Sequence, residues 1–488
     1  MKIHLSTLVL TAAGLLTAAQ AGTVSNTANS GAGSLRDVLA AAAPNEVINF
    51  APGLDGATIT LTSGELALSG RNVTLDASAL RGGVTLSGNN SSRILSITAG
   101  SNVTLKNLRF VAGREAANKG GGLLVAESGL AMEDCTIQGC YAGTDGGGIW
   151  LNSATGTLTR CRIVGNESGN FGGGLFIIGN TPLNLTSSQV SGNKSTIGGG
   201  LYVFSASPQI TNTTIQGNSG SGLATQTFAA PTLRNCILWA NRGGGGSTLA
   251  SQQLRNISVF NPSINTDPAP NVGFCLVEGA NSAADFSDNN LTTWSSGNLN
   301  GSTSQPAFIH SPAATAAPTS AANVRLSSTS AASNAGSNAA NSDLSDLASR
   351  PRVQGGTVDL GAFEGAYVSF ASLYPGLDPD GDANSNGLSN FGEYALGRDP
   401  TSAASAPGMP TISLSAGAPF LTLSERNNAA EVLPRWRTSI DLSTWTDLLE
   451  NTDYQIVSTS TPASGRTEYV LKLIGPKRFY QQRFSSGN

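Results

Sequence analysis

The chain has 488 residues, of which 39% are hydrophobic and 12% charged, with a net charge of −4 and 59 glycines. No cluster of basic residues is present, so the composition excludes a nucleic-acid-binding protein that relies on phosphate contacts. The low charge and high glycine content are typical of an extracellular β-rich protein rather than an all-helical cytosolic one.

The first 21 residues have the features of a secretory signal peptide. Lys2 lies near the start, an apolar stretch runs from Leu8 to Leu16, and small residues precede Gly22. We expect cleavage near Ala21 and a mature protein that is secreted or held at the bacterial cell surface. No later stretch reaches the ~20 apolar residues of a spanning helix, so no membrane-spanning segment is expected in the mature chain.

Residues 22–113 predict a helical cap followed by irregular coils. The segment Ser34–Ala41 begins like a capping box and precedes the strand-like Val47–Phe50. A short amphipathic helix here would close the end of a solenoid, which otherwise exposes apolar surface and strand edges. Alternating apolar residues predict strands at Ala57–Leu61, Val73–Leu75, Val84–Leu86, Ile94–Ile97 and Val103–Phe110.

Glycine triplets then return every 26 residues, beginning at Gly120, Gly146, Gly172 and Gly198. Each triplet precedes a short apolar run, and no 3.6-residue apolar stripe is present. A period of this length indicates a solenoid, and short runs separated by Gly and Asn indicate three short strands per coil. The sequence therefore predicts an all-β parallel β-helix over residues 22–365, with an irregular closing segment at its C-terminal end.

Asparagines recur at one corner of the predicted coils, at Asn166, Asn193, Asn218 and Asn241. Their side chains are expected to hydrogen-bond from coil to coil and to tolerate a left-handed backbone conformation. The glycines of the repeat allow a positive φ or close backbone packing where the strands bend.

Five cysteines, an odd number for an exported protein, lie at positions 135, 140, 161, 236 and 275. Cys135 and Cys161 occupy equivalent places in adjacent coils, and the ~4.8 Å between stacked strands is compatible with a disulfide. The alternative, which we favour, is a ladder of buried thiols that act as small hydrophobic residues. With His310 as the one histidine beyond the signal peptide, a Cys/His metal site is not expected.

Three aromatic residues occupy one position of the strand after the triplets: Trp150, Phe176 and Tyr202, preceded in the same column by Leu124. Alternation points their neighbours inward, so this column should point outward as an aromatic stripe. An exposed stripe would be a candidate binding site for a polysaccharide or a cell-surface partner. The favoured alternative is a stripe covered by residues 281–350 or by a loop of another coil.

Two motifs at the two ends of the predicted β-helix resemble those of a known family. The opening Gly33–Asp37, the glycine-triplet coils and the closing Gly356–Glu364 resemble bacterial choice-of-anchor Q proteins, which are related in repeat style to chlamydial polymorphic outer-membrane proteins. The resemblance implies an exported right-handed parallel β-helix at the cell surface and supplies no catalytic residues. The chain after Glu364 is too short for a translocating membrane barrel of about a dozen strands at ~10 residues each.

Residues 382–393 match the calcium-loop pattern D-x-[DN]-x-[DN]-G-x5-E at every specified position. Calcium prefers six to eight oxygen ligands, and the pattern supplies them from the side chains or carbonyls of Asp382, Asn384, Asn386, Leu388, Asn390 and Glu393. The loop is similar to the single calcium loops of dockerins, and residues 366–400 are assigned to it. Asp378 and Asp380 are alternative ligands from an overlapping loop. We expect structural calcium at a junction rather than signalling.

The end of the chain predicts a separate module. Residues 401–410, rich in Ala, Ser and Pro, read as a linker. Strand-like runs over residues 411–488 predict a small β-sandwich, used for sorting or attachment. The whole chain is expected to be a monomer.

The functional prediction is an exported adhesin-like scaffold with a polysaccharide or cell-surface partner. The alternative is a polysaccharide lyase or glycoside hydrolase whose carboxylates converge from distant coils. The densest charged patch is Arg114–Glu115 with Glu133–Asp134, which solvated turns explain adequately. No catalytic residue is assigned, and an enzyme is the less favoured reading.

Overall fold

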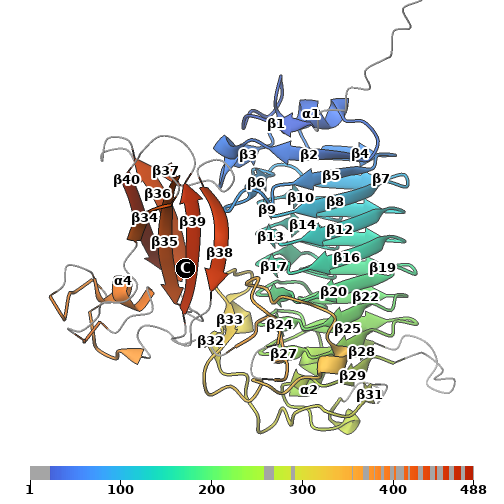
Figure 1. Ribbon diagram of the computed structural model, residues 1–488. Helices are drawn as coiled ribbons and strands as arrows, with labels where there is room; N and C mark the ends of the chain where they lie inside the picture. Colours follow the sequence, from blue (N-terminus) through green and yellow to red (C-terminus); the bar gives the residue numbers. More distant parts are fainter. Residues whose placement is uncertain are drawn as a thin grey trace, which may run out of the picture.

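The computed structural model describes residues 22–257, 269–286, 292–353, 356–365, 373–378, 380–385, 389–395 and 400–402, and seven strands between residues 411 and 486. The predicted parallel β-helix is confirmed, and it is right-handed. Its coils stack along one axis from β1 to β31 (Figure 1). Among the helices of the described residues, none is long and apolar enough to cross a membrane.

Three long parallel sheets form the sides of the helix. Sheet A contains β1 (Thr23–Val24), β2 (Glu46–Phe50), β5 (Val73–Asp76), β8 (Asn102–Lys106), β12 (Gly129–Glu133), β16 (Thr155–Thr159), β20 (Leu183–Thr186), β23 (Gln209–Thr211), β26 (Thr232–Arg234), β29 (Asn271–Gly273) and β31 (Thr293–Trp294). Sheet B contains β3 (Thr58–Thr60), β6 (Val84–Ser87), β9 (Leu108–Val111), β13 (Thr136–Gln138), β17 (Arg162–Val164), β21 (Gln189–Ser191), β24 (Thr214–Gln216), β27 (Ile237–Trp239) and β30 (Leu276–Val277). Sheet C contains β4 (Leu66–Ser69), β7 (Leu95–Thr98), β11 (Leu123–Ala126), β15 (Ile149–Asn152), β19 (Leu175–Ile178), β22 (Leu201–Phe204), β25 (Leu223–Gln226) and β28 (Leu254–Ile257).

The corner between sheets B and C carries a fourth, small sheet that the sequence did not predict. This sheet D contains β10 (Arg114–Glu115), β14 (Tyr141–Ala142) and β18 (Glu167–Ser168). The predicted run Val103–Phe110 is also two strands, β8 and β9, because Asn107 adopts a φ of 52° and turns the chain from sheet A to sheet B.

Helix α1 (Leu35–Ala41) covers the N-terminal end of the β-helix, as predicted. The hydroxyl of Ser34 accepts a hydrogen bond from the backbone N–H of Asp37 at 3.3 Å, which caps the first turn. Leu35 and Leu39 are buried against the first coils. A second short helix, α2 (Leu249–Gln253), lies in the insertion before β28 and was not predicted.

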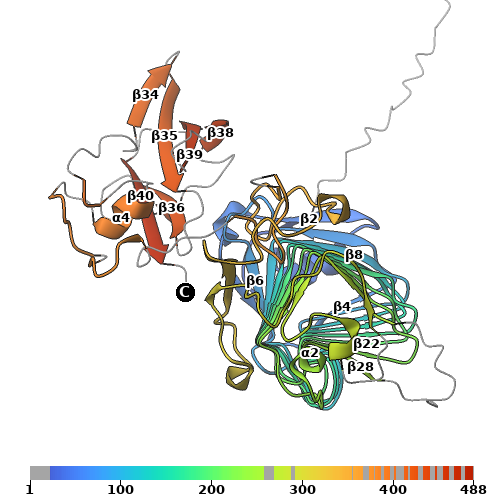
Figure 2. The same cartoon turned by 90° about the horizontal axis from the view of Figure 1, so that it is seen from below.

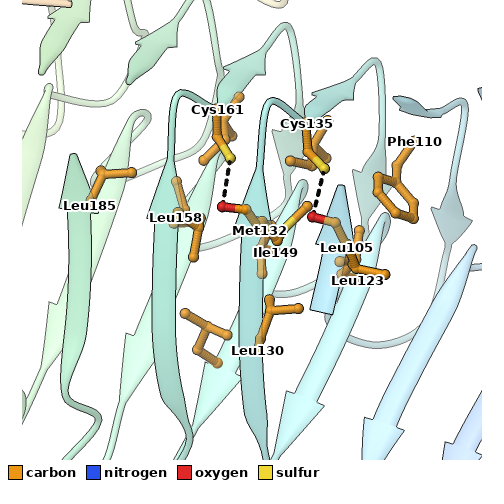
Figure 3. Packing of buried hydrophobic residues seen from close by; sticks show 14 of the residues in the cluster. Leu105, Phe110, Leu123, Leu130, Met132, Cys135, Ile149, Leu158, Cys161 and Leu185 are labelled. Carbon is orange, nitrogen blue, oxygen red and sulfur yellow. Dashed lines mark hydrogen bonds between the residues drawn. The ribbon is translucent and has the colours of Figure 1, made fainter. Parts of the chain in front are cut away.

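The core is one apolar cluster that runs through the coils from Val24 to Phe286. All five cysteines are free and buried, so the favoured ladder of thiols is confirmed. The thiols of Cys135 and Cys161 point inward and donate to the carbonyls of Leu105 and Met132, 3.4 and 3.7 Å away in the preceding coil (Figure 3). Burial raises the pKa of Cys135 to about 12, so this thiol stays protonated at neutral pH.

The corner asparagines form a continuous buried ladder, which we name the asparagine ladder: Asn166, Asn193, Asn218 and Asn241. The amide oxygens of Asn193, Asn218 and Asn241 each accept from the backbone N–H and the side-chain N–H of the asparagine one coil earlier, as in Asn166 to Asn193 at 2.9 and 3.0 Å. Cys140 starts the ladder and Gln253 ends it. The expected left-handed backbone belongs to the preceding residue instead, with positive φ at Gly165, Gly192, Gly217 and Ala240.

Residues 305–353 and 356–365, named the closing segment, lie over the outer side of sheet B. The segment pairs β32 (Phe308–His310) with β33 (Asn323–Leu326) and hydrogen-bonds to successive coils, for example through Gln216 to the carbonyl of Pro312 at 2.9 Å. In the end-on view of Figure 2 the coils superpose, and part of this segment lies outside the side that carries β6.

The closing motif folds around a buried arginine. Arg352 is 1% exposed and donates to the carbonyls of Asp359 and Gly361 at 3.0 and 2.6 Å. The buried carboxylates of Asp359 and Glu364 accept backbone N–H groups, from Asn334 at 2.6 Å and from Asp359 at 2.9 Å. The closing motif Gly356–Glu364 is therefore held by a buried network of hydrogen bonds, which fixes the end of the closing segment.

The C-terminal strands form two antiparallel sheets, and their packing as a small β-sandwich stays a prediction. The first contains β34 (Thr411–Ser415), β35 (Ala418–Arg426), β39 (Arg466–Leu473) and β38 (Tyr454–Ser460). The second contains β37 (Thr446–Asp447), β36 (Val432–Ser439) and β40 (Phe479–Ser486). Most of the predicted linker, residues 403–410, lies outside the described residues.

Candidate functional site

The aromatic stripe lies on the outer face of sheet C. Register pairing places Leu124, Trp150, Phe176, Tyr202 and Ala224 in one column across β11, β15, β19, β22 and β25. They form an apolar cluster separate from the interior core, which agrees with the outward direction that alternation predicts. The rings of Phe176 and Tyr202 stack with centroids 5.4 Å apart and planes inclined by 4°.

The stripe is covered, which is the alternative favoured from the sequence. Trp150, Phe176 and Tyr202 are 7%, 6% and 2% exposed. The cover includes residues that directly precede the glycine triplets, and none of residues 281–350 that the structure describes belongs to this apolar cluster. Phe171 stacks on Tyr202 with centroids 4.6 Å apart, and Lys119 holds its ammonium 4.4 Å from the centre of the Trp150 ring.

Polar groups at the Trp150 end of the stripe lack hydrogen-bond partners. The residues that directly precede the glycine triplets, Lys119, Asp145, Phe171 and Ile197, are named the covering row. Within this row, Asp145 forms a parallel β-bridge with Phe171 in the next coil. The indole Nε1 of Trp150 and the Oδ1 atom of Asp145 are both buried and have no hydrogen-bond partner. Burial raises the pKa of Asp145, opposed by a hydrogen bond from the Phe171 backbone and by the charge of Lys119. Burial, and then the charge of Asp145, raises the pKa of Tyr202 to about 12.

A second candidate site is a hollow of about 520 Å³ at the corner where sheet D begins. Glu65 and Glu115, from different coils, face it and share one partner: Arg93 lies 2.6 Å from Glu65 and 3.5 Å from Glu115. Arg93 also donates to the carbonyls of Lys119 and Gly120 at 2.9 and 2.8 Å. The two carboxylates thus come from the coils on either side of the Arg93 coil, not from distant coils as the enzyme alternative expects, and an arginine fixed to the backbone pairs with both.

The charged patch noted in the sequence is divided between two corners. Glu115 belongs to the hollow, and the guanidinium of Arg114 lies 4.5 Å from the centre of the Tyr141 ring. Glu133 and Asp134 instead pair with Arg160 at 2.5 and 2.7 Å. These last two carboxylates are therefore engaged in a coil-to-coil ion network.

The calcium-loop residues are only partly described. Asn386 and Leu388 lie outside the described residues. Asn384 donates from Nδ2 to the buried carboxylate of Glu393 at 2.7 Å. The amide of Asn390, the first residue of α4 (Asn390–Ala395), accepts from the N–H of Ala383 at 2.9 Å and so braces the loop. Asp382 is exposed at the loop entrance.

These described residues fit a hard cation. The Oδ1 atom of Asn384 is buried without a hydrogen-bond partner, next to the fully buried carboxylate of Glu393. Calcium takes such amide and carboxylate oxygens as ligands. No group of three or more His, Cys, Asp or Glu side chains suited to a metal is found among the described residues, but the predicted donor set draws mainly on amide and carbonyl oxygens.

The covering row was missed in the sequence, although a signal for it was present. Lys119, Asp145, Phe171 and Ile197 each precede a triplet, at the same 26-residue period. Aligning the residues before the triplets as well as those after them would have placed this row against the stripe. Glu65 and Arg93 have no such signal, because they lie in the irregular N-terminal coils.

Comparison with known proteins supports the fold. A family model described as a right-handed beta helix region matches residues 58–212, the part of the chain from β3 to β23. Searches of curated proteins and of solved structures gave no match.

Proposed function

We propose that this protein is an exported scaffold of the adhesin type, in which a rigid β-helix presents a polysaccharide-binding face at the cell surface or outside the cell. The continuity of coil-to-coil contacts carries the proposal. The asparagine ladder joins the corner between sheets B and C through successive coils, and the stacked rings of Phe176 and Tyr202 join the outer face of sheet C in the same coils. Such ladders favour a stiff rod over a structure that opens and closes.

The C-terminal part would serve attachment or sorting. Calcium in the loop at residues 382–393 would order α4, which contacts strands β35 and β40 of the C-terminal sheets. The choice-of-anchor Q resemblance of the β-helix agrees with a surface protein whose attachment lies beyond the solenoid.

One observation favours the enzyme alternative, namely the meeting of Glu65 and Glu115 in the hollow. A polysaccharide hydrolase needs two carboxylates that flank one sugar linkage. Because Arg93 holds both groups, this second function would require the substrate to displace Glu115, the more weakly paired of the two.

The two functions are separated by one assay on the chain from Gly22 to Asn488. The protein is mixed with insoluble neutral and acidic polysaccharides, and both retention and released products are measured. Retention without new reducing ends or unsaturated products is expected for the scaffold. Products that disappear in Glu115→Gln, but persist in the exposed Glu127→Gln control, would favour the enzyme. Neither retention nor products would contradict the proposed polysaccharide partner.

Calcium is expected to bind once and to stabilise the C-terminal part. Glu393→Gln keeps the volume of the side chain but removes the charged bidentate ligand, so calcium affinity should fall at least tenfold. Calorimetric titration measures the affinity, and proteolysis of the C-terminal strands with and without chelator measures the effect on order. Glu127→Gln, far from the loop in sequence, should bind like the wild type. The calcium site would be contradicted if the wild-type chain released or absorbed no heat on titration with calcium and gained no protection from proteolysis in its presence.

A further inference from the structure

The covering row protects the aromatic stripe unevenly along its length. Phe171 stacks on Tyr202 with ring planes inclined by 29° and packs in the same apolar cluster as Ile197, so this end is closed by apolar packing. Trp150 is covered by Lys119, whose ammonium rests on the ring by a cation–π contact. Residues 116–118, which lead to Lys119, are exposed. A lysine side chain has four rotatable bonds and a strongly hydrated head, so it leaves a ring more readily than a packed phenylalanine does.

The surface beneath Lys119 offers an incomplete set of hydrogen bonds. The Nε1–H group of Trp150 lacks an acceptor, and the Oδ1 atom of Asp145 lacks a donor, although both are buried. A buried polar group without a partner lowers stability, because its hydrogen bonds to water are lost and not replaced. A hydroxyl group can accept from an indole N–H and donate to a carboxylate, so a ligand rich in hydroxyl groups could satisfy both atoms.

The shape and charge of the surface around Trp150, Asp145 and Lys119 limit the chemical class of ligand that it can bind. An indole face packs well on the flat C–H face of a pyranose ring, and hydroxyl groups at the ring edge supply hydrogen bonds in both directions. Asp145 is engaged on its other side by the Phe171 backbone and lies within the field of Lys119, so the two charged groups are close neighbours. Released from the ring, Lys119 can offer its three N–H donors to the same sugar.

We propose that Trp150, Asp145 and Lys119 form a gated binding site for one pyranose unit of a polysaccharide, with Lys119 as the gate. The inference rests on the proposed function, since it locates the polysaccharide contact of the scaffold. It also limits the contact to one end of the stripe, because Phe176 and Tyr202 remain covered.

The test combines fluorescence quenching with calorimetry on the full mature chain. Acrylamide quenching reports the exposure of tryptophan without any ligand, and calorimetric titration with cellohexaose, chitohexaose or hexagalacturonate reports binding without depending on Trp150 as a fluorophore. Lys119→Ala removes the gate, so quenching by acrylamide should increase and binding should tighten several-fold. Trp150→Phe should weaken binding at least tenfold and abolish the extra quenching when combined with Lys119→Ala. Trp239→Phe, on β27 of a different sheet, is the matched control and should bind like the wild type.

The outcomes separate this site from the general function. Wild-type binding that survives Trp150→Phe would overturn the site but leave the polysaccharide scaffold intact. Quenching that is unchanged in Lys119→Ala would overturn the gate. If the wild type binds none of the three sugars and no polysaccharide in the retention assay, both the site and the proposed function are contradicted.

Discussion

Replacing Asn193 with alanine is expected to lower the free energy of unfolding of the β-helix by about 3–5 kcal/mol. The Asn193 amide oxygen accepts from the backbone and side-chain N–H groups of Asn166, and its own N–H donates to the carbonyl of Ile163 at 2.9 Å and to Asn218 at 3.0 Å. Alanine leaves the backbone N–H of Asn166 and the carbonyl of Ile163 buried without these partners. Because each coil contacts only its neighbours, amide exchange should rise first in β17, β21 and β24.

Two further variants test whether the ladder is the cause. Asn184→Ala, at an exposed position of β20, should change stability by no more than about 0.5 kcal/mol. Asn193→Asp keeps the acceptor but cannot donate, and it buries a charge, so burial should raise the pKa of the new carboxyl group above its unfolded value. Its destabilisation should therefore be full at neutral pH and decrease as pH falls toward the unfolded pKa. Equal exchange in Asn193→Ala and Asn184→Ala would show that the ladder contributes little.

The repeats made the regular part of the fold predictable. A 26-residue period aligned the strands of sheet C that follow the glycine triplets, and asparagines at intervals of 27, 25 and 23 residues marked one corner. Residues that stack in a solenoid occupy the same environment and therefore have similar side chains. Sheet D escaped prediction for the converse reason. Its two-residue strands, such as Arg114–Glu115 and Tyr141–Ala142, share no residue type at paired positions and are held by the backbone geometry of the corner.

The candidate site was predictable only in part. Alternation placed Trp150, Phe176 and Tyr202 on the outer face, but burial depends on the cover that another row of the same coils supplies. The ion network of Glu65, Arg93 and Glu115 joins residues from coils without a fixed period, so spacing could not bring them together. The turn at Asn107 did leave a signal, because the apolar alternation shifts by one residue there, from Val103 and Leu105 in β8 to Leu108 and Phe110 in β9.

Replacing Gly173, the middle glycine of its triplet, with alanine is expected to be among the most disruptive single changes in the β-helix. A Cβ atom at this position would overlap the carbonyl oxygen of Lys194 and lie 2.6 Å from that of Gly199, both on the backbone of the next coil. A flexible side chain could move aside, but these carbonyls are fixed by the stacking of the coils. We expect a loss of about 4 kcal/mol or more, or failure to fold, measured as soluble yield and melting temperature.

A matched substitution separates this close approach from the loss of glycine itself. Gly53 has no atom within 4 Å of the position of an added Cβ and does not have a positive φ. Gly53→Ala should therefore leave the melting temperature within about 2 °C of the wild type, since surface substitutions away from special features change stability by about 0.5 kcal/mol or less. If Gly173→Ala also melts within that range, the coils must be able to separate locally at the triplets. The backbone of the corner that carries the covering row would then be able to move locally. Opening of the site at Lys119 would in that case involve movement of this backbone as well as of the lysine side chain.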